Sequence, residues 1–270
     1  MPAADKVKSM KNDSEVHWDL AAESFKDFRR PLSCVLFAVL TSLILFLPVI
    51  ANSQALTGTT GYYNIPSAEI HPDRTMFIGS NLLSKEYKKW GSPNHDAMNF
   101  FVTTSFLPFA EVSIRFTRVI DLDDYSSTVG DRMASARIRV LNEGKYYPAV
   151  LIGMQNFFTT LSSGDASHFN STYLVVTKNF NLPKVIENIG LTAGYGSDVL
   201  QAADYQFIGF FGGIKITPKK LNFLELMIEY DADKWNTGAR VTILKHIVLL
   251  GGLEGLDAFS GGVSYRFLLP

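Results

Sequence analysis

Cysteine is almost absent from this sequence of 270 residues, with Cys34 as the one example. Cys34 lies in a long apolar run near the N-terminus, which we interpret below as a leader peptide. Once that run is removed, the chain can form neither a disulfide nor a cysteine-based metal site. The remaining fold must be stabilised by packing, hydrogen bonds and charge pairs.

An excess of basic charge is also lacking, because the formal net charge is −1. This balance argues against a nucleic-acid partner. The histidines have no metal-ligand spacing such as H-E-x-x-H, and no glycine loop of the phosphate-binding type is present. We therefore expect no nucleic acid, no metal and no cofactor.

The apolar run is Leu32–Ile50, preceded by Arg29 and Arg30 and followed by small residues at Ser53 and Ala55. A basic region, an apolar core and a small-x-small site are typical of a secretory signal peptide. We predict cleavage after Ala55, which makes residues 1–55 an N-terminal extension with a signal peptide and residues 56–270 a single outer-membrane β-barrel domain. The alternative is a transmembrane anchor, because the run is about long enough to span a bilayer.

The last strand-like segment, Gly261–Phe267, has an apolar residue at every second position: Val263, Tyr265 and Phe267. Small or polar residues lie between them, which predicts a strand with one apolar and one polar face. Strands of this type close outer-membrane barrels. Gly262, Tyr265 and Phe267 also resemble the C-terminal signal that barrel-assembly machinery recognises. The alternative is the final strand of a soluble β-sandwich.

The same alternation recurs along the chain, with no convincing helix after residue 55. We predict an all-β fold, a transmembrane antiparallel up-and-down β-barrel of about 12 strands, which is an even number as bacterial barrels require. The predicted strands are Asp73–Ser84, Ala97–Leu107, Ala110–Val119, Asp131–Leu141, Tyr147–Phe157, Phe169–Phe180, Asn188–Gly196, Phe207–Thr217, Leu221–Asp231, Asn236–Leu244, His246–Leu253 and Ala258–Phe267.

The connections between these strands alternate in length. If the mature N-terminus is periplasmic, the first, third, fifth and seventh connections face outward, and all four are long and polar. Several of the intervening ones are short, such as Pro108–Phe109 and Pro218–Lys220. Long outer loops and short periplasmic turns are typical of outer-membrane barrels.

If the apolar residues face lipid, a set of charged residues of both signs faces the lumen. Ionised groups inside a narrow barrel must pair or stay hydrated, so this set can form a salt-bridged plug or a wet lumen. In a soluble sandwich they would form the solvated face. The candidate lumen charges are Glu111, Arg115, Arg137, Arg139, Glu225, Glu229, Arg240 and Arg266.

Several short motifs occur in a characteristic order from Leu56 to Phe267. They are Gly58–Ala68 (with Gly58, Gly61, Pro66 and Ala68), Gly130–Arg132, Glu143 with Tyr147–Ala149, Gly153–Phe157, Gly194–Gly196, Phe211–Gly213, Glu229–Asp231 and Gly261–Tyr265. Together they resemble the YjbH family of outer-membrane proteins linked to exopolysaccharide production. The resemblance implies no catalytic residues. We expect Gly58–Ala68 to lie in the periplasmic mouth of the barrel.

The leading hypothesis is a non-enzymatic outer-membrane component of exopolysaccharide or capsule biosynthesis or export. Its expected partners are outer-membrane lipid, the barrel-assembly machinery, polysaccharide and other proteins of the exopolysaccharide system. One alternative is a porin-like channel for small solutes. Another is a barrel enzyme acting on lipid or glycan, with His95 and His168 in outer loops.

Overall fold

The computed structural model describes residues 54–87, 95–120, 131–159, 169–182, 186–200, 202 and 204–270. Residues 1–53, which include most of the predicted signal peptide, its anchor alternative and Cys34, lie outside these ranges, as does His168. Gln54 and Ala55, the last two residues before the predicted cleavage site, are described. Within the ranges just given, the chain forms no helix with the length and hydropathy of a membrane span.

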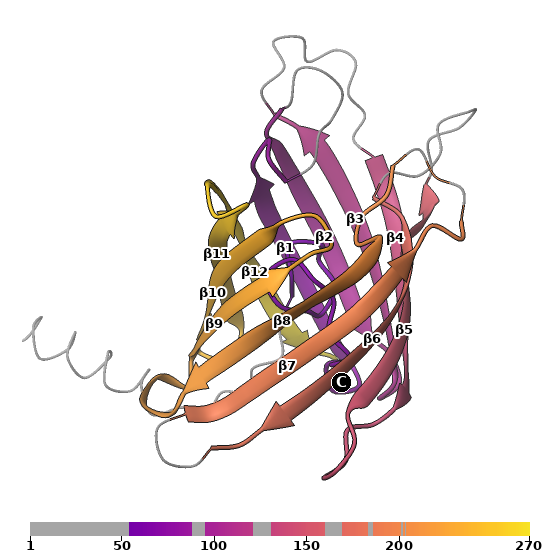
Figure 1. The fold of residues 1–270 in the computed structure, drawn as a ribbon. Helices are drawn as coiled ribbons and strands as arrows, with labels where there is room; N and C mark the ends of the chain where they lie inside the picture. Colours follow the sequence, from indigo (N-terminus) through magenta and orange to yellow (C-terminus); the bar gives the residue numbers. More distant parts are fainter. Residues whose placement is uncertain are drawn as a thin grey trace, which may run out of the picture. The chain divides into compact units, whose positions relative to one another are not determined.

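Twelve antiparallel strands form a closed barrel in which each strand pairs with its neighbours in sequence and β12 pairs with β1 (Figure 1). The predicted all-β barrel, the number of strands and their up-and-down order are confirmed. The strands are β1 (Thr75–Leu83), β2 (Ala97–Ser105), β3 (Ala110–Val119), β4 (Asp131–Leu141), β5 (Ala149–Thr159), β6 (Ser171–Phe180), β7 (Ile186–Ser197), β8 (Gly209–Pro218), β9 (Leu224–Tyr230), β10 (Trp235–Ile243), β11 (Ile247–Glu254) and β12 (Ala258–Leu268).

The largest difference from the predicted boundaries is the start of β9, at Leu224 instead of Leu221. Pro218 has no N–H to continue the ladder, so β8 ends there. A short 3-10 turn, Lys219–Leu221, then reverses the chain before β9 begins.

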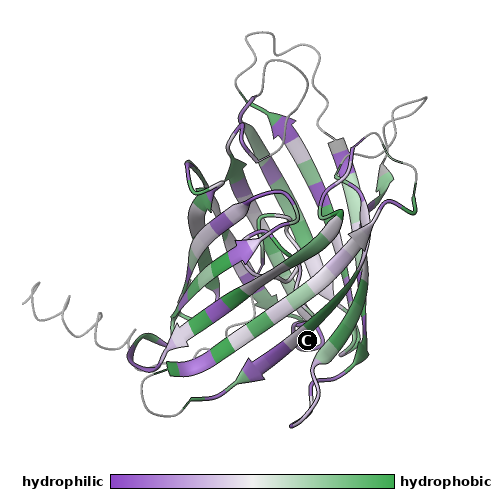
Figure 2. Cartoon of the chain, viewed as in Figure 1, coloured by the Kyte–Doolittle hydropathy of each residue, from purple (hydrophilic) through white to green (hydrophobic). Residues whose placement is uncertain are grey.

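The outward face of the barrel is apolar, and Figure 2 shows hydrophobic bands alternating with hydrophilic ones along the strands. On β3 the predicted alternation holds, because Val112 and Ile114 are exposed while Glu111, Ser113 and Arg115 are buried. Large aromatic side chains are exposed towards both ends of the barrel. They are Phe106, Phe109, Tyr146, Tyr147 and Phe180 at one end, and Phe158, Tyr195, Phe210, Trp235 and Phe259 at the other.

The two ends of the barrel differ in their connections. We call the end that carries the β2–β3, β4–β5, β6–β7, β8–β9 and β10–β11 connections the turn end, and the opposite end the loop end. The C-terminus lies at the turn end, where Leu269 N–H donates to the Arg74 carbonyl over 2.8 Å. The chain therefore enters β1 and leaves β12 at the same end.

The segment before β1 lies inside the barrel. Every residue from Gln54 to His71 is buried except Glu69, which is partly buried. This segment contains the Gly58–Ala68 motif that was predicted to lie at the mouth. It reaches much deeper, because Asn64 bonds Asp231 beside the β9–β10 turn at the loop end. We call Gln54–His71 the plug.

Candidate functional site

The plug has no regular secondary structure, so its backbone groups need other partners inside the lumen. A few are satisfied internally, for example by Leu56 N–H to the Tyr63 carbonyl over 2.8 Å and Tyr62 N–H to the Ile65 carbonyl over 3.0 Å. Many of the others bond to side chains of the barrel wall. The lumen charges are therefore part of a docking site for this segment.

Arg240 on β10 holds three carbonyl groups of the plug at once. Its Nη2 donates to the carbonyls of Gln54 (3.0 Å), Gly61 (2.8 Å) and Tyr62 (2.6 Å). Its Nη1 donates to Glu225 Oε2 on the adjacent strand over 2.7 Å. A fully buried guanidinium is tolerated because a carboxylate and three carbonyls replace its water.

Glu229 on β9 binds backbone N–H groups of the plug, whereas Arg240 binds its carbonyl groups. It accepts the backbone N–H groups of Tyr63 (3.0 Å), Asn64 (2.7 Å) and Ile65 (3.2 Å). Three successive amides converge on one fully buried side chain, as in an anion-binding nest. The turn of the plug around Asn64 is thereby fixed to the wall.

Glu111 on β3 and Arg137 on β4 form a third anchor, with 2.7 Å between Oε1 and Nη1. Glu111 also accepts the Thr60 N–H over 2.9 Å. Arg137 donates to the carbonyls of Ser67 and Glu69. The pair thus holds two separate parts of the plug.

Lys215 on β8 completes this set and was missed in the sequence. Its Nζ lies 2.8 Å from Glu69 Oε2 of the plug and 3.5 Å from Glu225 Oε1. The surrounding Gly209–Gly213 stretch obscured the alternation of β8. Glu69 was missed because it precedes the first strand, although its place in the motif segment was a usable signal.

The other predicted lumen charges contact different groups. Arg115 lies over the Phe169 ring, 5.5 Å from its centroid. Arg139 and Arg266 are partly buried at the turn end, where they donate to the carbonyls of Pro108 and Lys245. These two arginines brace connections of the barrel.

Tyr265 and Phe267, from the predicted barrel-assembly signal, point outward from β12 and are exposed. Gly262 lies on the same strand and is paired with Asn81 of β1. These residues therefore border the seam where the first and last strands meet.

The glycines of the motif are required by close packing and by backbone conformation. A Cβ on Gly61 would overlap the Ile65 carbonyl oxygen, and Gly58 has φ +83° with Phe101 directly beside it. Both positions exclude larger residues for reasons of space, and Gly58 also for its left-handed backbone. The motif glycines thus let the plug fold back on itself.

His71 ends the plug as a buried neutral side chain. Burial lowers its pKa well below the usual value, and nearby Arg266, Arg137, Arg240 and Lys215 lower it further. Its Nε2 lies 3.2 Å from Gln54 Oε1, which the neutral tautomer with a proton on Nε2 satisfies. This contact joins the two ends of the plug.

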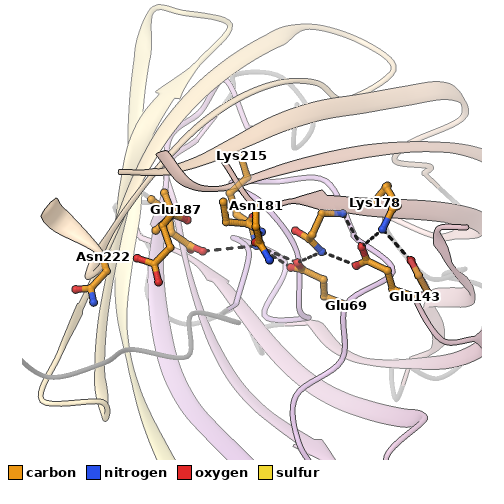
Figure 3. A pocket seen from close by; sticks show the side chains of 12 residues that line it. Glu69, Glu143, Lys178, Asn181, Glu187, Lys215 and Asn222 are labelled. Atoms are coloured by element: carbon orange, nitrogen blue, oxygen red, sulfur yellow. Dashed lines mark hydrogen bonds and ion pairs between the residues drawn. The ribbon is translucent and has the colours of Figure 1, made fainter. Parts of the chain in front are cut away.

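A cavity lies at each end of the barrel. The turn-end cavity has a volume of about 600 Å³ and is lined by Glu69 of the plug together with wall and turn residues (Figure 3). The loop-end cavity, about 280 Å³, is lined by Tyr87, Gln206, Asp231 and their neighbours. The two cavities share no lining residue, and the buried plug lies in the lumen with them.

Candidate chemistry is limited in the described part of the chain. There, no group of three or more His, Cys, Asp or Glu side chains is placed to hold a metal ion. His95 lies at the loop end, next to β2, while His168 falls outside the described residues. The alternative of a barrel enzyme with these histidines in its outer loops thus stays a prediction.

Fold and site together define a class: a closed twelve-strand antiparallel barrel whose lumen holds its own N-terminal segment. A family model described as "Exopolysaccharide biosynthesis protein YbjH" matches residues 53–207, more than half of the chain. The protein belongs to this YjbH family, and the match begins at the plug. Among curated proteins, none matches the chain.

Proposed function

We propose that this protein is a non-enzymatic β-barrel of the outer membrane that takes part in exopolysaccharide or capsule biosynthesis or export. Membership of the YjbH family supports the link to polysaccharide. The filled lumen is the observation that carries the proposal, because a barrel occupied by a bonded, buried plug is not a constitutively open porin. It suits a scaffold or an exporter that opens on a signal.

The outward face supports a membrane location. An apolar band between two sets of exposed aromatic side chains is the surface expected of a barrel in lipid. The predicted signal peptide and the C-terminal residues Gly262, Tyr265 and Phe267 fit a client of the barrel-assembly machinery. The turn end would then face the periplasm.

The location is tested by fractionating the native host and running its outer membrane on a gel with and without boiling. A folded barrel migrates differently before and after heating. We expect a heat-modifiable band in the outer-membrane fraction. Recovery of the chain in the soluble fraction would contradict the proposal.

The functional link is tested by deleting the gene and measuring secreted carbohydrate. We expect the deletion to lower secreted polysaccharide and the full chain to restore it. A complementing chain with Ile114→Val, a conservative change on the outward face, should restore it equally. Unchanged secretion after deletion would remove the proposed role.

The closed lumen is tested by planar-bilayer conductance of the purified full chain. We expect no steady current from the wild-type protein. Steady ohmic steps would favour the porin alternative over a plugged component.

A further inference from the structure

The turn-end cavity is unusual in having a lining made entirely of polar side chains and one glycine. Protein pockets for drug-like ligands are lined mainly by apolar groups. Here the wall offers carboxylates, amides, ammonium groups and a hydroxyl. The lining residues are Glu69, Glu143, Gly144, Lys178, Asn179, Asn181, Glu187, Asn188, Lys215, Thr217, Asn222 and Glu225.

Part of this lining is held rigid by its own contacts. Glu143 bonds the Lys178 ammonium over 2.6 Å and the Asn179 side chain over 2.9 Å. Partial burial raises the pKa of Glu143, but these bonds outweigh that effect and lower it. Asn179 also reaches Glu69 over 3.3 Å, so the network extends to the plug. The cavity is thus a preorganised surface.

Other lining groups remain accessible from the cavity. In Figure 3, Glu187 and Asn222 lie on one side of the lining, and Glu69, Glu143 and Lys178 lie on the other. An amide both donates and accepts hydrogen bonds, a carboxylate accepts and an ammonium donates. Such a mixture matches a ligand with many hydroxyl groups, each of which donates and accepts.

The charge of the lining narrows the ligand class. Four carboxylates against two ammonium groups leave a formal charge of −2. A uronic acid or a phosphate would be repelled in a partly enclosed space where solvent screening is reduced. A neutral sugar meets no such penalty, and an amino sugar is attracted.

We propose that the turn-end cavity binds a neutral or amino-sugar segment of a glycan and discriminates against acidic saccharides. This inference rests on the proposed function, because the family's link to exopolysaccharide makes a glycan the expected ligand. The ligand enters from the turn end and contacts Glu69, which belongs to the plug. Binding in this cavity therefore involves the plug directly.

The test is calorimetric titration of the purified full chain in detergent with three disaccharides. They are N,N′-diacetylchitobiose, which is neutral, the disaccharide of glucosamine, which is cationic, and digalacturonic acid, which is anionic. We expect the first two to bind at least about tenfold more tightly than the third. Absence of binding by all three, or equal binding of digalacturonic acid, would overturn the inference.

A charge-reversal variant separates recognition from structural support. Glu187→Lys together with Asn222→Lys changes the formal charge of the lining from −2 to +1. We expect the preference to invert towards digalacturonic acid by about tenfold, while the gel shift on heating stays unchanged. The control is Glu86→Lys, the same kind of change at an exposed loop-end position. An unchanged preference in the double variant would contradict the inference.

The two proposals fail in distinguishable ways. If the gene deletion lowers secreted polysaccharide but no disaccharide binds, the cavity inference falls and the proposed function stands. If secretion is also unaffected by the deletion, both fall.

Discussion

The outward and inward faces of strand β9 differ in how well they should tolerate substitutions. Leu226 and Ile228 point outward and are about half exposed, at 45% and 48%. Glu225 and Glu229 point inward and each bonds particular atoms of Arg240 or of the plug. Apolar residues of similar size can replace one another on the outer face, whereas each inner charge has one geometry that satisfies it. The inner face is therefore where single substitutions should do most harm.

The largest effect is expected from Arg240→Ala. The change removes the donor of three plug carbonyls and leaves Glu225 with Lys215 as its remaining cation. Breaking a buried ionic contact of this type costs about 3–5 kcal/mol. We expect ionic current in planar bilayers where the wild type gives none. Val241→Ala, the adjacent residue on the other face, is the control and should remain silent.

Glu229→Gln should weaken plug docking by up to about 3 kcal/mol, because a buried N–H left without an acceptor costs about 1–3 kcal/mol. The amide keeps the shape but presents an NH₂ group to one of the three converging N–H groups. Limited proteolysis should cut the plug faster while the barrel stays intact. If the plug is cut at the same rate in the wild type and in the Glu229→Gln variant, the three hydrogen bonds to Glu229 contribute little to docking of the plug.

Gly61→Ala should cost about 2 kcal/mol, since the new methyl group overlaps a backbone oxygen that cannot move freely. The expected readout is partial opening, measured as intermittent current. Gly251→Ala offers a comparison on the barrel wall, in β11, where the added Cβ would meet only the side chain of Phe259, at 3.3 Å. If Gly61→Ala and Gly251→Ala give the same current, overlap with the Ile65 carbonyl oxygen does not decide whether the plug opens.

Acidification should weaken docking of the plug less than any of the three substitutions above. The pKa of His71 is lowered in the folded state, so its contribution to docking is complete above the unfolded pKa, about 6.5. Below that pH the undocked state binds the extra proton, and docking weakens by up to about 1.4 kcal/mol per pH unit until the folded pKa is reached. Proteolysis of the plug from pH 7.5 to pH 6, about half a unit below that pKa, measures a loss of at most about 0.7 kcal/mol. His71→Gln should flatten the dependence.

The sequence predicted the fold well because outward alternation is a local property. Each strand carries its own apolar face, so twelve strands could be recognised one at a time, and Ala110–Val119 and Asp131–Leu141 agree with the structure residue for residue. The assignment of Glu111, Arg137, Glu225, Glu229 and Arg240 to the inner face follows from the same period.

The partners of those charges could not be predicted, because they depend on how a nonrepetitive segment folds in three dimensions. Glu229 accepts hydrogen bonds from three backbone amides and has no cation among the described residues as its partner there. The sequence around Asn64 carries no pattern that predicts this arrangement. Arg139 and Arg266 follow the same alternation as the inner charges, but their positions near the strand ends place them at the turn end. The two-residue period of a strand shows which side chains point into the lumen. Which group each of them contacts depends on its depth in the barrel and on the pairing register of the strands.

The plug also constrains the order in which the molecule can be assembled. It directly precedes β1. The barrel closes where β1 pairs with β12 through eight residue pairs, from Thr75 with Leu268 to Leu82 with Gly261. The bulky Tyr62 and Tyr63 enter the lumen most easily while the edges of β1 and β12 are still apart. We expect the strands to assemble around the plug, with the pairing of β1 and β12 as the last step.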